Sequence, residues 1–194
     1  MQKRQTNSKT NIKKAFIHLL QTKGLESLTV SDIARDAQIN RGTFYMHYID
    51  KYDLLAQLED ELIENLTEIF LSSDHSQNLD DPLQVIPYHA ILSALQYAKE
   101  NYDLIRLLLM GNDPQFITRF KSLLEQLIEQ QVKHSHKLQL SRQGLPEDYA
   151  TEILLASIIA IITLWLQKGA IESPESIAKI ISKAREISPY ELLM

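Results

Sequence analysis

The sequence predicts an all-α fold, and three observations favour it. Gly and Pro, which interrupt helices, number only 5 and 6 in 194 residues. Apolar side chains recur at helical spacing along most of the chain, and no segment shows the period-two alternation of a strand. Hydrophobic residues make up 44% of the chain, which is enough to build a core and excludes disorder as the main state. We expect about nine helices.

Four helices are expected in the first 71 residues, each with a start or stop signal. Gly24 is placed to end the first, because glycine accepts the left-handed backbone that closes many helices. Thr29 opens the second, with Asp32 three residues later in a pattern close to a capping box. Asn40 and Asp50 can cap the third and the fourth. The expected ranges are 11–22, a short helix from 29, 41–48, and 51 to about 71.

Five more helices are expected in the rest of the chain. The polar stretch 72–81 has no periodic pattern and is expected to be a loop, and 141–146 is a second break. Prolines stand near three of the helix starts, where a missing N–H costs little. The expected ranges are about 82–100, 102–110, 114 to about 136, 147–168 and 174–187.

Charge divides the chain near residue 51. Residues 1–51 contain nine Lys or Arg and four Asp or Glu, a formal charge of +5, whereas residues 52–194 contain eleven and twenty-one, a charge of −10. A chance surface asymmetry would explain the charge alone, but a basic head also suits a polyanionic partner. We predict two domains, 1–51 and 52–194.

Several classes of protein are disfavoured by what the sequence contains. Cysteine is absent, which excludes disulfides, thiol catalysis and zinc sites that need Cys. The histidines His134 and His136 stand two apart rather than four, so we expect no metal and no cofactor. The longest uncharged apolar run, 153–167, is shorter than the ~18–20 residues of a membrane span. We expect a cytoplasmic protein without a membrane partner.

Two short helices joined by the tight connection 37–40 form a candidate helix-turn-helix. The second helix, 41–48, must pack one face inward and present polar groups to a DNA groove. Phe44 and Tyr48, four residues apart, can supply the inward face, and Gly42 would let the backbone approach DNA closely. Donors that suit phosphates or base edges are Arg41, Thr43, Tyr45, His47 and, at the next helix start, Lys51.

A specific resemblance rests on the stretches GLESLTVSDIA (24–34), NRGTFYMHY (40–48) and DKYDLL (50–55). Residues 11–58 resemble the DNA-binding domain of the tetracycline-repressor (TetR) family of transcriptional regulators. The resemblance implies an all-helical protein, with a three-helix DNA-binding head. It also implies that the fourth helix joins this head to a C-terminal domain that dimerises and often holds a small effector.

The resemblance also implies contact roles for matching positions. Arg41 and Gly42 stand where family members usually touch bases. Phosphate contacts are implied for Thr43, Tyr45, His47 and Lys51, and Ser31 stands at another frequent contact position. Gln38 departs from the pattern, because the family commonly has Gly in this turn. A residue other than Gly with positive φ costs about 1 kcal/mol there.

The C-terminal part resembles one branch of the same family, common in Firmicutes. The matching pieces are NYDLIRLLL (101–109), WLQKG (165–169) and SPE (173–175). This resemblance implies a regulator but does not indicate its effector.

The expected helix 147–168 is apolar nearly all round between residues 153 and 166. Such a helix must be buried on all sides, and in a domain this small a second chain is the natural cover. A central core helix of a monomer is the alternative. We predict a homodimer, with an interface that includes Ala156, Ile159, Ala160 and Thr163.

Aromatic and Met residues on several expected helices could converge on an effector pocket, although ordinary core packing explains any one of them. A neutral or cationic ligand is favoured because no pair of Lys or Arg lies within these apolar faces. The candidate residues are Tyr88, His89, Tyr97, Met110, Phe116, Phe120 and Trp165.

These observations together predict a sequence-specific, DNA-binding transcriptional regulator. We expect a ligand-responsive repressor that binds a near-palindromic double-stranded operator as a homodimer. An activator, or an adaptor of the same fold acting through protein contacts, is the alternative. A helical enzyme ranks lower, because the sequence has no Gly-rich phosphate loop and no evident nucleophile–base pair.

Overall fold

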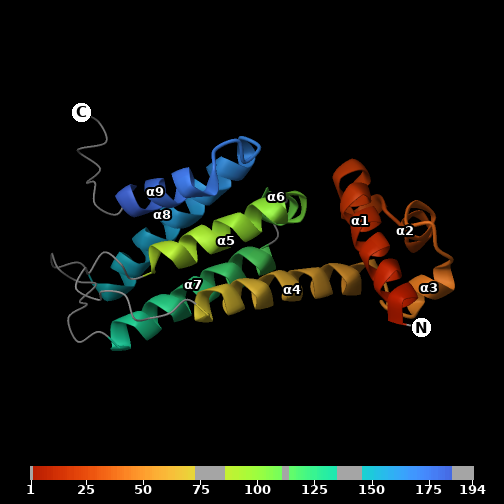
Figure 1. The fold of residues 1–194 in the computed structure, drawn as a ribbon, viewed down its shortest axis with the longest axis horizontal. Helices are drawn as coiled ribbons and strands as arrows, with labels where there is room; N and C mark the ends of the chain where they lie inside the picture. Colours follow the sequence, from red (N-terminus) through yellow and green to blue (C-terminus); the bar gives the residue numbers. More distant parts are fainter. Residues whose placement is uncertain (1, 73–85, 111–113, 135–145, 185–194) are drawn as a thin grey trace. The chain divides into compact units, whose positions relative to one another are not determined.

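A computed structural model describes residues 2–72, 86–110, 114–134 and 146–184. These residues form nine α-helices and no strand (Figure 1), as the sequence predicts. The helices are α1 (Gln2–Ser27), α2 (Val30–Asp36), α3 (Arg41–Tyr45), α4 (Lys51–Leu71), α5 (Tyr88–Glu100), α6 (Tyr102–Met110), α7 (Pro114–His134), α8 (Glu147–Gln167) and α9 (Pro174–Ala184).

The chain divides into two compact units, Met1–Leu62 and Ile63–Met194. The structural division therefore falls within α4, while the functional boundary predicted after residue 51 stays a prediction. In the first unit, α1 packs on α2 and α2 on α3. Its core contains side chains that are almost fully buried, including Ile12, Phe16, Leu28, Ile33, Phe44 and Leu54.

The capping signals predicted for the first unit are confirmed. Thr29 and Asp32 form both hydrogen bonds of a capping box at the start of α2. The Asn40 side chain caps α3, and Asp50 Oδ1 accepts the backbone N–H groups of residues 52 and 53, each at 2.8 Å. Because these bonds connect residues only a few positions apart, they can be predicted from local sequence.

Three helix boundaries in the first unit differ from the sequence prediction. The first helix, predicted from residue 11, begins at Gln2. Gly24, with φ of 73°, interrupts α1 as a kink, and the helix ends only at Ser27. The third helix ends at Tyr45 instead of Tyr48, because the backbone turns at Met46 and the His47 N–H donates to the Phe44 carbonyl at 2.9 Å. This turn still allows the Tyr48 side chain to be buried.

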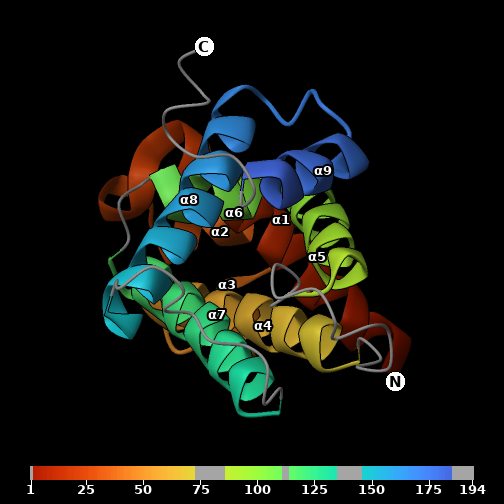
Figure 2. The same ribbon diagram turned by 90° about the vertical axis from the view of Figure 1, so that its left-hand side faces the viewer.

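In the second unit, α9 packs against α5 and α8, and α6 contacts α5, α7 and α8. Figure 2 looks along this unit and shows α5, α7, α8 and α9 with the end of α4 around a common interior. The predicted start of α5 at Pro82 is wrong, because Pro87 is extended and the helix begins at Tyr88. The ends predicted at residues 136 and 187, and the loops, lie outside the described residues.

Among the described residues, α8 is the one helix long and apolar enough to cross a membrane by length and composition. The sequence analysis judged the length of a membrane span from the uncharged run 153–167 alone. The whole helix has 21 residues and is therefore longer than that run. Only 22% of its most apolar window is buried within the chain. One such helix is weak evidence for a membrane span, because the core helix of a soluble protein passes the same test.

Candidate nucleic-acid interface

The short helix α3 is fixed at its start by Asn40. The Asn40 Oδ1 atom accepts the Thr43 N–H at 2.7 Å and the Thr43 hydroxyl at 3.1 Å. Phe44 and Tyr48 are buried, as their spacing predicts, and their rings lie 5.6 Å apart between centroids. The opposite side of α3 is left exposed to solvent.

Arg41 and Tyr45 lie together on this exposed side. The Arg41 guanidinium donates to the Tyr45 hydroxyl at 3.3 Å, and its Cζ lies 5.9 Å from the centre of the ring. The ring of Tyr45 in turn meets Phe44 edge-on, with centroids 5.6 Å apart. A buried phenyl ring therefore supports an exposed tyrosine, which orients an exposed arginine over the surface of α3.

The neighbouring predicted contact residues also belong to the first unit. Gly42 is exposed, and a Cβ atom built there would lie 3.2 Å from Asn40 Oδ1, so a larger residue would press on the cap. His47 is half-buried, with its ring 6.2 Å from that of Tyr48. Ser31 is exposed in the first turn of α2.

Lys51 lies at the start of α4, but its ammonium group is already engaged. It donates to the backbone carbonyls of Leu25, Glu26 and Leu28 at 2.8, 3.0 and 3.1 Å. Three carbonyls match the three donors of an ammonium group. Lys51 thus connects the end of α1 to the start of α4, a role that no local sequence signal indicates. Its predicted phosphate contact stays a prediction.

The turn between α2 and α3 contains the strain that the sequence predicts. Gln38 has φ of 55°, the left-handed region that glycine adopts more easily. The Ile39 N–H donates to the Ala34 carbonyl at 2.9 Å and closes the end of α2. Ile33 and Ala37 on one side of this turn, and Phe44 on the other, are buried and anchor it in the core of the first unit.

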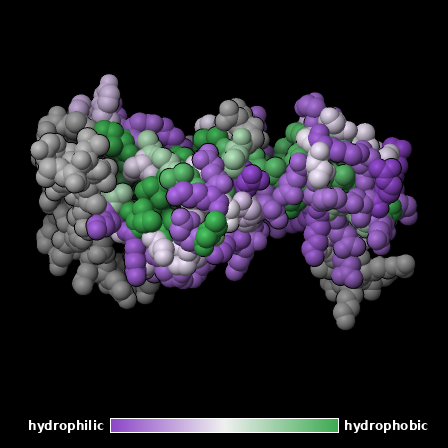
Figure 3. All heavy atoms as spheres, turned by 90° about the horizontal axis from the view of Figure 1, so that it is seen from above, coloured by the Kyte–Doolittle hydropathy of each residue, from purple (hydrophilic) through white to green (hydrophobic). Residues whose placement is uncertain are grey.

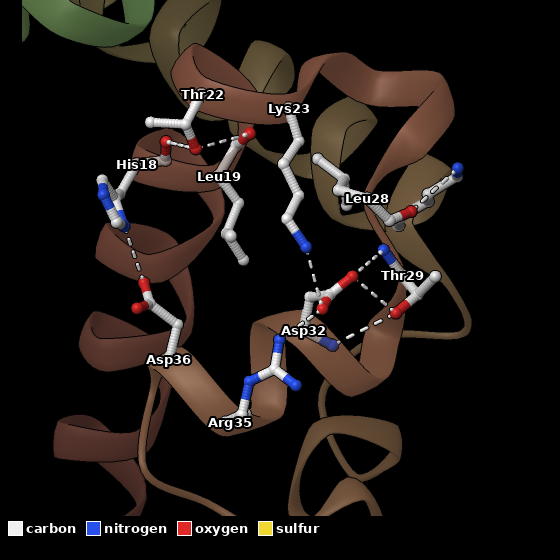
Figure 4. A network of polar contacts seen from close by, with 10 residues as sticks. His18, Leu19, Thr22, Lys23, Leu28, Thr29, Asp32, Arg35 and Asp36 are labelled. Atoms are coloured by element: carbon white, nitrogen blue, oxygen red, sulfur yellow. Dashed lines mark hydrogen bonds and ion pairs between the residues drawn. The ribbon is translucent and has the colours of Figure 1, made fainter.

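A polar network connects α2 to α1 (Figure 4). Asp32 accepts from the Thr29 N–H and hydroxyl, pairs with Lys23 at 3.0 Å and accepts from Arg35 at 2.6 Å. The Lys23 ammonium and the Thr29 hydroxyl lower the pKa of Asp32 from 3.8 to about 2. A second contact joins His18 Nδ1 to the carboxylate of Asp36 at 3.1 Å.

In the second unit, α8 has an apolar face that the described residues leave exposed. Figure 3 views the side on which α9 lies, and shows apolar residues gathered between hydrophilic ones. Ile153 and Leu164 are 61% and 51% exposed. Of the predicted interface residues, Ala156 and Ala160 are exposed, while Ile159 and Thr163 are half-buried. This face is the surface that the sequence assigns to a second copy.

An apolar cavity that is partly open to solvent lies within the second unit. Residues from α4 to α9 and Ile86 line it, and all of them are Ala, Leu, Ile or Phe. Phe116 and Phe120 belong to the lining.

The other five residues of the predicted pocket do not line this cavity. Tyr88, His89 and Met110 are exposed. The Tyr97 hydroxyl accepts from Asn65 Nδ2 at 3.1 Å, and the buried Trp165 indole donates to the Glu172 carbonyl at 3.0 Å. The lining residues belong to the apolar, inward-facing stripe of each helix, and this stripe is the sequence feature that could have predicted them. Aromatic and Met residues taken alone do not predict the lining.

Two family models match the chain. One, described as bacterial regulatory proteins of the tetR family, matches residues 12–58, which contain α2, α3 and the start of α4. The other, described as a transcriptional regulator C-terminal region, matches residues 87–186, about half of the chain.

Individual proteins show the same likeness. An uncharacterized HTH-type transcriptional regulator of Bacillus subtilis (strain 168), YxbF, is 24% identical over 174 residues. That alignment covers 89% of this chain but only 43% of the relative, so the chain spans less than half of that protein's length.

Solved structures match over nearly the whole chain. A TetR transcriptional regulator from Streptococcus agalactiae 2603V is 28% identical with a TM-score of 0.63, over 95% of this chain and 96% of that one. NalD, the secondary repressor of the MexAB-OprM multidrug efflux pump in Pseudomonas aeruginosa, is 22% identical with a TM-score of 0.64, over 95% and 96%. At this identity, the likeness to NalD shows the fold alone.

Proposed function

Since the chain belongs to the tetR family of bacterial regulatory proteins, and is thus a DNA-binding transcriptional regulator, we propose that it is a ligand-responsive repressor. In this proposal two copies bind a near-palindromic operator, and each inserts α3 into a major groove. Binding of a small neutral or cationic molecule in the second unit shifts the population towards a form with lower DNA affinity. The protein acts in the cytoplasm and catalyses no reaction.

The single observation that supports DNA reading most directly is the Arg41–Tyr45 pair on α3. Arginine can donate two hydrogen bonds to the O6 and N7 atoms of guanine, which distinguishes this base from the others. The hydroxyl and ring of Tyr45 hold the Arg41 guanidinium in place before DNA binds. Arg41 therefore loses less side-chain entropy when it contacts a base. We assign base reading to Arg41, assisted by the close backbone approach at Gly42.

Phosphate contacts are assigned to exposed or half-exposed groups around α3. Ser31, Thr43, Tyr45 and His47 carry donors suited to phosphate oxygens. Lys51 is treated separately, because its ammonium group bonds to three carbonyls. We assign it a positioning role, in which it holds the α1–α2 connection in place and so supports the orientation of α2 and α3.

The exposed face of α8 supports the homodimer. A single chain leaves Ile153 and Leu164 largely in water, and a second copy of the same face would cover both. Ala156 and Ala160 are small, which lets a partner helix approach closely. Two symmetric heads then require half-sites spaced by about one helical turn of DNA, roughly 34–36 Å.

A gel shift with DNA from upstream of the protein's own gene tests this proposal. The wild type should bind this DNA more tightly than an unrelated fragment of equal length. Arg41→Ala should lose most of that preference, whereas Lys99→Ala, which removes one exposed charge from α5, should not. Equal binding of wild type to both fragments at all salt concentrations would exclude sequence-specific reading. A reporter gene behind the same DNA distinguishes a repressor from an activator.

A further inference from the structure

Among the described residues, those that line the cavity of the second unit offer no hydrogen-bonding side chain to a ligand. Six helices contribute to its lining, and each contributes only Ala, Leu, Ile or Phe. Small-molecule sites usually combine apolar walls with a few polar groups that orient the ligand. Here every described wall residue is apolar, which favours an apolar ligand.

Three polar side chains from the same helices already have partners, whereas the buried Nε atom of Arg106 on α6 has no hydrogen-bond partner among the described residues and does not belong to the lining. The Tyr97 hydroxyl is bonded to Asn65, the Trp165 indole to the Glu172 carbonyl, and the Tyr102 hydroxyl donates to the Leu166 carbonyl at 3.2 Å. Turning any of them toward the cavity would break a bond within the fold. A charged or strongly polar group placed in the cavity would therefore lose its hydration without a replacement.

The shape of the cavity depends on small residues and stacked rings. Ala94 and Ala98 lie four residues apart on α5, so this part of the wall carries only methyl groups. On α7, the Phe116 and Phe120 rings are nearly parallel, at 5°, with centroids 6.5 Å apart. Smooth apolar walls of this kind suit a hydrocarbon chain, which gains contact area without needing hydrogen bonds.

We propose that this cavity binds the hydrocarbon chain of an uncharged lipid-like molecule, such as a medium-chain alcohol or ester. This inference rests on the effector response proposed above. It restricts the effector, proposed there to be neutral or cationic, to a neutral aliphatic molecule. The polar end of the ligand stays at the mouth, in water. An ammonium or carboxylate end carries no advantage, because none of the described lining residues is charged.

A chain-length series gives the first test. The probes are 1-hexanol, 1-octanol and 1-decanol, added to the full protein below the concentrations at which they aggregate and measured by calorimetric titration. Each added CH₂ should lower Kd about fourfold, the factor that corresponds to about 0.8 kcal/mol of hydrocarbon burial, until the cavity is filled. Decyltrimethylammonium and decanoate should bind no more tightly than 1-decanol. Tighter binding of either charged probe would overturn the proposal.

Variants of the wall give the second test. Ala94→Leu puts three carbons into the cavity and should weaken 1-decanol binding at least about tenfold, more than the fourfold step of one CH₂. Ala150→Leu makes the same change on α8 outside the lining and should not weaken it. Ile162→Val enlarges the cavity and should favour longer alcohols. Unchanged 1-decanol affinity in both Ala94→Leu and Ile162→Val would show that the alcohol binds elsewhere.

The same samples separate this inference from the proposed function. A gel shift without alcohol should be equal for wild type, Ala94→Leu and Ala150→Leu. If wild type binds DNA specifically but no alcohol, the ligand inference fails while the regulator proposal stands. If wild type binds alcohol but no specific DNA, the regulator proposal fails and the cavity assignment stands as a binding site.

Discussion

Replacing Lys51 by Met tests whether this lysine holds the first unit together or binds phosphate. Methionine keeps an unbranched apolar stem and removes only the charged donors. The carbonyls of Leu25, Glu26 and Leu28 would then lose their side-chain partner at the end of α1. Carbonyls at a helix end lack partners within the helix and lie at the negative end of its dipole. An ammonium group therefore stabilises them both by hydrogen bonds and by its positive charge.

The expected loss can be bounded from this geometry. A hydrogen bond to a charged group contributes about 1.5–3 kcal/mol. The three acceptors share one half-exposed ammonium, so we expect a total in this range rather than three times as much. Local opening of the α1–α2 connection should then rise about 10- to 150-fold, by the ratio of about 1.4 kcal/mol per tenfold change.

Amide hydrogen exchange of residues 25–30 measures this opening directly. Lys51→Met should speed exchange there, and Lys14→Met, which removes an exposed charge from α1, should not. The salt dependence of DNA binding provides the opposing test. A direct phosphate contact predicts that Lys51→Met lowers the slope of log K against log salt by about 0.9. Unchanged exchange together with that smaller slope would refute the positioning role.

Three further predictions follow from the described contacts. Arg41→Ala should weaken operator binding by about 1–3 kcal/mol and relax the preference at one base pair in each half-site, measured by gel shifts on single-base operator variants; unaltered preference would rule out base reading. Ala160→Glu places an unpaired charge in the proposed interface, at a cost of several kcal/mol, so sedimentation should show a dimer for wild type and a monomer or aggregate for the variant. A monomeric wild type at micromolar concentration would count against the dimer. Because the pKa of Asp32 is lowered to about 2, the folded first unit binds fewer protons than the unfolded chain, and its stability should fall as pH drops from about 4 to about 2. Asp32→Asn should remove this part of the acid transition in urea unfolding curves recorded across that pH range; a wild-type curve that does not vary there would contradict the reasoning.

Local signals predicted the first unit best. The caps at Thr29, Asn40 and Asp50 depend on residues within three positions, so they can be recognised without knowledge of the tertiary structure. The burial of Phe44 and Tyr48 follows from helical spacing in the same way. The resemblance predicted backbone strain at Gln38, where the family commonly has Gly. The structure has a positive φ at this residue.

Contacts between distant residues account for what the sequence did not predict. The Lys51 ammonium meets carbonyls 23 to 26 residues away, and no spacing rule connects them. Aromatic side chains were expected to share one pocket, but Tyr97 and Trp165 instead satisfy hydrogen bonds at the edges of their helices. The predicted start of α5 failed because a proline near a helix start does not by itself fix the first helical residue, and the backbone is still extended at Pro87.

If two subunits pair through the exposed apolar face of α8, as proposed, the lifetime of each subunit depends on its abundance. A paired subunit then hides Ile153 and Leu164, whereas a lone subunit presents them to chaperones and proteases. Pairing stabilises the folded chain by mass action, so dilution alone lowers its melting temperature. A cell that makes half as much of this protein would therefore retain less than half of the working pairs, which gives the regulator a threshold in its own concentration.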